Sequence, residues 1–326
     1  SAIMQMNGDG RVRMMIGGVD IGQGAYTAMA QIAAQELDLP IEHIDIMTDI
    51  DTRANPYDWN TVASKLTFMG GNAVINASRE LLQKMKEVAA QVLKTEPKYL
   101  AHANGEIYHV HNPERKLTYK QIALGYMYPG GTSIGGPLMA TGTYIADGLT
   151  NLHPETGQGA PALVWTFGAH AVEIEVDVET GSIEVLKVAS AFDIGQVINE
   201  KLVYGQICGG VMQGLGSAIL EGYKFSNDVK LMNPSFTDNK IPTMKDMPKK
   251  IVPIYIENPQ HNGPYGARGV GEHPMISIPS AVGNAVYDAL GINFHVLPLS
   301  PEAIVLGIES GKKSILCTDV DCLPGR

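Results

Sequence analysis

The chain has 326 residues, a formal net charge of −10 at pH 7 and 44% hydrophobic residues. This length allows a substantial core and about two domains. The acidic balance argues against nucleic acid or an anionic membrane as a partner, and no apolar run approaches the roughly 20 residues of a membrane span.

The N-terminal residues and the cysteines indicate a cytoplasmic protein. The first residues, SAIMQMNGDGRVRMM, do not form a signal peptide, because no apolar stretch follows a basic start. The three cysteines, Cys208, Cys317 and Cys322, are too few for a disulfide framework. Cys317 and Cys322 lack two further ligands at close spacing, so we interpret them as ordinary thiols rather than half of a metal site.

The first part of the chain predicts a hairpin followed by alternating helices and strands. Residues 1–16 hold two strand-like runs around a glycine turn, which is typical of a β-hairpin. An amphipathic helix is predicted after the glycines at 22–24 and ends at Pro40. Residues 41–51 predict a strand, and 72–94 predict a long helix with charge pairs four residues apart.

Residues 95–162 are less regular, and from residue 163 the spacing of apolar residues changes to every second position. Residues 95–162 contain a short hairpin around Gly105 and then an irregular connection dense in glycine and proline. From residue 163 polar and apolar residues alternate, which predicts strands on both sides of the turn at 179–181.

The last part predicts a glycine-rich helix at 204–223, a proline-rich connection at 245–259, a helix at 277–291 and a final strand. The chain as a whole predicts an α+β fold with mixed sheets. We expect two domains, residues 1–160 and 161–326.

Four glycine-rich segments stand out, at 18–26, 60–72, 204–216 and 266–274. Three lead into a helix, where free backbone N–H groups and the helix dipole favour an anion. None fits a P-loop or a dinucleotide-binding turn, and each glycine alone is also explained by a turn or by close helix packing. Together they suggest one large ligand with phosphates, and the amides of Gln23, Gln206 and Gln213 can donate to and accept from a heterocycle.

Catalysis by the chain's own metal ligands or nucleophiles has little support. The nine histidines are scattered without zinc spacing, and a Ser/His/Asp triad stays open although no nucleophile elbow occurs. Glu272 is an isolated carboxylate between Gly271 and His273. Such a residue can act as a general base or can cap the helix that follows it, and the segment alone does not separate the two.

Five motifs, taken in order, carry a family resemblance. DGRVRMMIGGVDIGQG, NTVASKLTFMGGNAV, DVETGSIEVLKVASAFDIGQVIN, YGQICGGVMQGLG and GARGVGEHP resemble the second half of the molybdopterin-binding subunit of molybdenum hydroxylases, the xanthine dehydrogenase and aldehyde oxidoreductase family. The resemblance runs from about residue 3 to about residue 308 and implies two mixed domains of the molybdopterin-binding type. The family's first half is missing here, which implies a large molybdopterin subunit that supplies the other half of the cofactor site.

The resemblance also implies site residues. Glu272 matches the active-site base, although the family commonly has proline or serine where this chain has His273. The backbone of Ala63 is expected near molybdenum, and Lys65 near the phosphates. The residues expected to bind the cofactor are Gly22, Gln23, Gly24, Ala63, Ser64, Lys65, Gln206, Gln213, Val270 and Gly271.

The implied activity is the hydroxylation of a carbon next to nitrogen in an N-heterocycle, with water as the oxygen source. The implied cofactor is molybdenum with molybdopterin cytosine dinucleotide and a terminal sulfido or selenido ligand, held by the pterin rather than by a side chain. Electrons would pass through [2Fe-2S] clusters and FAD to NADP. This chain has no signature for either group, so an iron-sulfur subunit and an FAD subunit are expected in a dimer of heterotetramers.

Three alternatives remain at this stage. A purine, an aldehyde or an aromatic acyl thioester could be the substrate within the same family. The chain could instead be a non-catalytic cofactor-binding scaffold or assembly factor, which an uncharged residue at position 272 would favour. A simple nucleotide-binding protein is the third, and the absence of a phosphate-binding motif argues against it.

Overall fold

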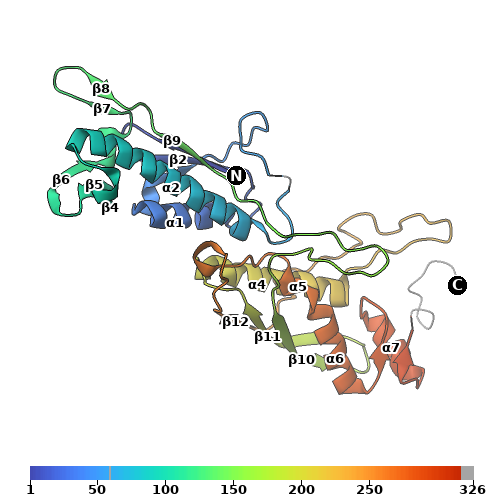
Figure 1. The fold of residues 1–326 in the computed structure, drawn as a ribbon. Helices are drawn as coiled ribbons and strands as arrows, with labels where there is room; N and C mark the ends of the chain where they lie inside the picture. Colours follow the sequence, from blue (N-terminus) through green and yellow to red (C-terminus); the bar gives the residue numbers. More distant parts are fainter. Residues whose placement is uncertain (59, 317–326) are drawn as a thin grey trace. The chain divides into compact units, whose positions relative to one another are not determined.

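The chain folds into two compact units, and the computed structural model describes residues 1–58 and 60–316. Unit 1 comprises residues 1–165, 195–199 and 258–269, and unit 2 comprises 166–194, 200–257 and the described residues from 270 onward (Figure 1). Both units contain helices and strands, which confirms the predicted α+β class.

Unit 1 is built on a four-stranded sheet in the order β3-β2-β1-β9. Helices α1 and α2 pack side by side against this sheet, and one hydrophobic core holds buried residues from both helices and the strands (Figure 1). The elements are β1 (Ala2–Met6), β2 (Val12–Ile16), β3 (Ile44–Ile46), β9 (Met139–Gly142), α1 (Ala25–Leu37) and α2 (Leu66–Leu93).

The predicted N-terminal hairpin is confirmed. Strands β1 and β2 pair antiparallel, with Met4 opposite Met14. Both side chains are fully buried, because alternate residues of a strand face the same side of the sheet. The methionines of this hairpin therefore fill the core between the sheet and the helices.

Helix α2 begins six residues before the predicted start at residue 72, so part of the glycine-rich segment 60–72 is helical. Gly71 lies inside this helix, where an added Cβ would stand 2.7 Å from the Pro264 side chain. Close packing against the returning chain thus outweighs the low helix propensity of glycine.

The rest of unit 1 consists of short elements. The predicted hairpin around Gly105 is confirmed, whereas the strand predicted for 41–51 is reduced to a 3-10 turn and the short β3. These elements are η1 (Ile41–His43), η2 (Pro97–Tyr99), β4 (Leu100–Ala103), β5 (Glu106–His109), β6 (Asn112–Thr118), α3 (Tyr119–Ile122), β7 (Tyr126–Met127), β8 (Ser133–Ile134) and η4 (Pro264–Gly266).

Unit 2 contains a three-stranded sheet in the order β10-β11-β12. The two strands predicted around the turn at 179–181 are confirmed as β10 (Gly168–Val176) and β11 (Ile183–Asp193), which pair antiparallel. The prediction of a mere connection at 245–259 was wrong, because β12 (Lys250–Ile256) pairs parallel to β11. Pro253 is tolerated there because β12 is an edge strand and needs no N–H on its open side.

The helices of unit 2 cover one face of this sheet and share its core. Helix α7 was not predicted, although Ser300 accepts a hydrogen bond from the Ala303 N–H at 3.2 Å and Pro301 follows it, which is a recognisable helix start. The elements are α4 (Glu200–Leu215), the π turn η3 (Gly216–Leu220), α5 (His273–Ile276), α6 (Ile278–Leu290), β13 (Asn293–Phe294), α7 (Pro301–Glu309) and β14 (Ser314–Ile315). Among the described helices, none has the length and apolar character needed to cross a bilayer.

Candidate functional site

Three of the glycine-rich segments touch one another in unit 1. An added Cβ at Gly18 would stand 2.3 Å from the Leu66 side chain. The Val19 N–H donates to Thr61 Oγ1 at 3.0 Å. An added Cβ at Gly269 would stand 1.7 Å from the carbonyl oxygen of Ser64, so only glycine fits there.

The turn before α2 has an unusual backbone. Ala63 and Ser64 have φ values of 57° and 52°, so two successive residues other than glycine adopt the left-handed conformation. Such residues cost on the order of 1 to 3 kcal/mol each and cluster at functional sites. Lys65 follows and forms an ion pair with Asp58, in which both side chains are less than a fifth exposed.

The start of α1 carries its own anion. The Asp20 carboxylate accepts hydrogen bonds from the Gly22 N–H at 2.9 Å and the Tyr26 N–H at 3.1 Å. This carboxylate therefore occupies the helix terminus at which a phosphate was predicted. At α2 the residue at the helix start is Lys65, whose side chain makes no capping hydrogen bond.

Gln23 braces the loop in which it lies. Its Oε1 accepts from the Ile21 N–H at 2.6 Å, and its Nε2 donates to the Val19 carbonyl oxygen at 2.9 Å. Gly22 has a φ of 104°, and a Cβ built there meets no described atom within 4 Å. The loop is thus internally ordered and open at Gly22.

The segment that ends at Gly269 is fixed to the helices of unit 1. Asn72 Nδ2 donates to the Asn262 carbonyl oxygen at 2.9 Å. The Tyr265 hydroxyl donates to the Glu36 carboxylate at 2.9 Å, and the same carboxylate lies 3.1 Å from the Arg79 guanidinium. These contacts hold Gly269 against the strained turn.

In unit 2, Glu272 immediately precedes the short helix α5 and is exposed. Among the described residues its side chain makes no capping hydrogen bond to that helix, so the capping alternative gains no support. The two residues after it are anchored. Pro274 packs on Gly210 of α4, where an added Cβ would stand 2.6 Å from Pro274 Cβ. The His273 ring packs edge-on against Phe192 of β11, with centroids 5.3 Å apart.

Gln206 and Gln213 both lie on α4, seven residues apart, so they project from the same side of the helix. Gln206 stands one turn before Gly210, the residue against which Pro274 packs. The segment after Glu272 packs on the second half of α4, at Gly210 and Gly214, and Gln206 precedes these contacts along the helix. Val270 and Gly271, which precede Glu272, are half-buried.

A pair of half-buried histidines, His170 and His273, follows Glu272 or packs near it and was missed by the sequence reasoning. His170 Nδ1 lies 2.8 Å from Ser190 Oγ. The His170 ring also packs edge-on against Phe192, the ring that His273 contacts, with centroids 5.2 Å apart. Nε2 of His273 is buried without a hydrogen-bond partner among the described residues, whereas the His170 ring interacts with the Pro274 backbone. The strand alternation gave a usable signal, because it puts His170 on the same face as the core residue Val172.

This histidine pair predicts a pH dependence of stability. Burial lowers the pKa of His273 to about 4, below the unfolded value of about 6.5, and burial also lowers the pKa of His170. The unfolded chain then binds more protons in mildly acidic solution, so stability is fully present above about pH 6.5 and is lost as the pH falls toward about 4.

The variant His273→Phe keeps an aromatic ring against Phe192 but cannot titrate. Urea unfolding at about pH 7.5 and about pH 5 should therefore show a smaller loss of unfolding free energy for the variant than for the unmodified chain. An equal loss in both proteins would contradict the assignment of this pH dependence to His273. Between about pH 7.5 and about pH 9, the change in unfolding free energy should be the same for the variant and the unmodified chain.

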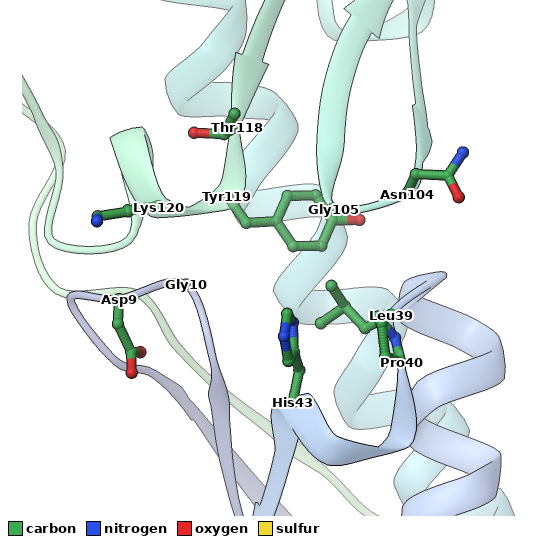
Figure 2. Close-up of a pocket in the computed structure, with 10 residues that line it drawn as sticks. All are labelled: Asp9, Gly10, Leu39, Pro40, His43, Asn104, Gly105, Thr118, Tyr119 and Lys120. Carbon is green, nitrogen blue, oxygen red and sulfur yellow. The ribbon is translucent and has the colours of Figure 1, made fainter.

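The pocket in Figure 2 contains none of the predicted site residues. It lies in unit 1, with a volume of about 270 Å³, below the roughly 300 to 1,000 Å³ of usual ligand pockets. The Tyr119 ring lies across its middle, and the hydroxyl of that residue donates to the Leu37 carbonyl oxygen at 2.8 Å (Figure 2). We assign no ligand to it.

The described residues contain no group of three or more His, Cys, Asp or Glu side chains that could hold a metal ion. Cys317 and Cys322 lie outside the described residues, so their predicted role as ordinary thiols stays a prediction.

Comparison with known proteins adds a family to this geometry. Residues 1–248 match the molybdopterin cofactor-binding domain. The chain is 31% identical to the nicotine 6-hydroxylase large subunit of Paenarthrobacter nicotinovorans over 308 residues, which is 94% of this chain and 36% of the relative. It is 29% identical to the putative xanthine dehydrogenase molybdenum-binding subunit of Escherichia coli K12, covering 93% of this chain and 38% of the relative.

A solved structure shows the same fold. Quinoline 2-oxidoreductase from Pseudomonas putida 86 matches with a TM-score of 0.78 and 27% identity, over 94% of this chain and 38% of that chain. The chain thus spans well under half the length of the relatives that it matches.

Proposed function

Since the chain belongs to the molybdopterin-binding domain family of xanthine dehydrogenase and aldehyde oxidoreductase, we propose that it forms part of the catalytic subunit of a molybdenum hydroxylase. The observation that carries this proposal is the packing of Gly269 on the Ser64 carbonyl, three residues before Glu272. It ties the strained turn before α2 to the segment that carries the only carboxylate of the GARGVGEHP motif.

The cofactor residues proposed in unit 1 are those of the loop 22–24 and the turn 63–65. Several features support them: the open space at Gly22, the left-handed Ala63 and Ser64, and their position directly before the N-terminus of α2. The positive end of the helix dipole at that terminus and the charge of Lys65 suit the phosphates of a pterin dinucleotide. Because Lys65 is paired with Asp58, phosphate binding would have to share or replace that ion pair.

The cofactor residues proposed in unit 2 are Gln206 and Gln213 of α4 and the backbone of Val270 and Gly271. The glutamines project from one side of the helix, and their amides can pair with a heterocycle. The donor set of the described residues fits a metal held by the pterin, since the site offers amides and backbone rather than clustered metal-binding side chains. The Ala63 backbone is the part of unit 1 that we place nearest molybdenum.

Glu272 is the proposed general base. The bound molybdenum centre would supply the two-electron oxidation and activate oxygen derived from water. Glu272 would accept the proton that this activation releases. Its side chain is not used as a helix cap, and the packed residues His273 and Pro274 fix its backbone, which is the positioning a base requires.

We propose an N-heterocycle as the substrate, hydroxylated next to nitrogen, and nicotinate to 6-hydroxynicotinate as the specific reaction. Relatives named for nicotine and quinoline support the heterocycle. Relatives named for xanthine and for aldehydes favour the alternative, a purine or aldehyde substrate. The chain would correspond to the medium molybdopterin subunit of a nicotinate dehydrogenase.

The remaining components belong to partners in this proposal. A large molybdopterin subunit would complete the cofactor site, and an FAD subunit and an iron-sulfur subunit with [2Fe-2S] clusters would carry electrons to NADP. The cofactor would be the cytosine dinucleotide form with a sulfido or selenido ligand, and the whole complex would be a cytoplasmic dimer of heterotetramers.

The test is to purify the complex without oxygen, measure molybdenum, selenium and released cytosine nucleotide, and assay nicotinate against xanthine. We expect about one molybdenum per copy of this chain and faster turnover of nicotinate. Faster turnover of xanthine would replace nicotinate by a purine substrate. A molybdenum-free preparation that is active on either compound would defeat the proposed function.

A further inference from the structure

The sheet of unit 2 has two faces of different character. On one face, Val172, Val188 and Ile251 belong to the core shared with α4 and α6. Side chains one residue further along each strand point the opposite way, because successive residues of a strand alternate. We call that opposite side the outer face.

The register divides the outer face into rows of neighbours across the three strands. The first row is charged and the next two are apolar: Glu173, Lys187 and Lys250; then Ala171, Ala189 and Val252; then Ala169, Ala191 and Ile254. The last row holds Phe167, Asp193 and Ile256, in which the Asp193 N–H donates to the Phe167 carbonyl oxygen at 2.9 Å.

The apolar rows are partly exposed, although their composition suits a covered surface: Ala189, Ala191 and Val252 are half-buried and Asp193 is buried. Phe167, Ile254 and Ile256 are 68%, 45% and 48% exposed, and Ala169 and Ala171 are exposed as well. A sheet face in water normally carries polar side chains, as the charged row on this same face does. Eight of the nine residues in the three rows beyond it are apolar, Asp193 being the exception, which is typical of an interface core with a polar border.

We propose that these three rows, the outer patch, are the surface on which the large molybdopterin subunit docks. The inference rests on the proposed function, which requires that subunit. The matching part makes up at most 38% of the length of each relative compared above. In those relatives more than half of the protein lies outside the matching part and could cover this face within one molecule. The four alanines of the patch leave little side chain to keep an apposed backbone away, so a closely packed, largely apolar partner surface fits it.

The first experiment identifies the occupant. Ala191→Cys, at the centre of the patch, is introduced into the tagged chain, the holoenzyme is purified, and a short bismaleimide cross-linker is added. We expect a new cross-link to a polypeptide that carries the further molybdopterin-binding sequence, as identified by mass spectrometry. The unmodified complex gives the background from the natural cysteines.

The second experiment measures the contribution of the patch. A charge buried without a partner weakens an interface strongly, so Ala191→Glu should lower the affinity of the chain for the large subunit by about 100-fold. Lys187→Glu, on the same strand and face but in the charged row, is the matched control and should retain the partner. Circular dichroism and thermal unfolding of each purified variant test whether it is folded.

Other results would overturn the proposal. Cross-linking to a second copy of this chain, to the chain itself or to the FAD or iron-sulfur subunit would assign the patch to that occupant instead. Full retention of the large subunit by a folded Ala191→Glu chain would exclude the patch from the interface. Molybdenum content is read separately, so a cross-linked complex without molybdenum would refute the proposed function and leave the docking surface standing.

Discussion

Replacing Glu272 by glutamine is expected to lower turnover by about 100-fold to 10,000-fold, the usual contribution of a positioned general base. Glutamine has nearly the same shape but cannot accept the proton. Because Glu272 is exposed and does not cap α5, the fold of unit 2 and the loading of molybdenum should be unchanged. Steady-state kinetics with nicotinate, together with metal analysis of the same preparation, measure both quantities.

The matched control is Glu309→Gln, the same substitution at the exposed end of α7 in unit 2. It should leave turnover and molybdenum content at the level of the unmodified complex. If Glu272→Gln keeps full activity at normal molybdenum content, the assignment of the base is wrong. If it loses molybdenum instead, Glu272 acts in cofactor binding rather than in proton transfer.

The second large effect is expected from Gly269→Ala. The added Cβ would stand 1.7 Å from the Ser64 carbonyl oxygen, and backbone on both sides would have to move. Overpacking of this kind costs about 1 to 3 kcal/mol, and here it would also displace the left-handed turn at Ala63 and Ser64. We expect a lower midpoint of urea unfolding and a complex that retains only a small part of its molybdenum.

Gly283→Ala is the control for this prediction. Gly283 lies inside α6, and a Cβ built there meets no described atom within 4 Å. Alanine should therefore be neutral or stabilise the helix by about 0.5 to 1 kcal/mol. Normal stability and molybdenum content in Gly269→Ala would show that the contact with Ser64 is not required, and would remove the main support for the proposed site.

Strong local patterns allowed several elements to be predicted. The β1–β2 hairpin, α1 and the β10–β11 pair each have a clear period of apolar residues and a glycine or a turn at their ends. The order of the glycine motifs indicated the family, and the comparisons confirm it. These successes share a cause, since each depends on residues that are near one another along the chain.

The errors arose where contacts between distant residues outweigh local preference. Strand β12 contains Pro253, which argues against a strand until its place at the sheet edge is known. The predicted start of α2 at residue 72 was too late, because Gly71 lies inside the helix, where Pro264 packs closely on it. Asp20 fills the α1 terminus at which a phosphate was predicted, and only its folded position shows this.

The sequence by itself determined the family, the fold class and the identity of the carboxylate to test, because motif order and residue type are read directly from the sequence. Only the tertiary structure decided that Gly269 packs on Ser64, that His170 and His273 flank Phe192, and that the apolar rows of β10, β11 and β12 form one surface. The physical reason is that each of these features joins segments far apart in the chain. Their closeness depends on the packing of whole elements, which no local period encodes.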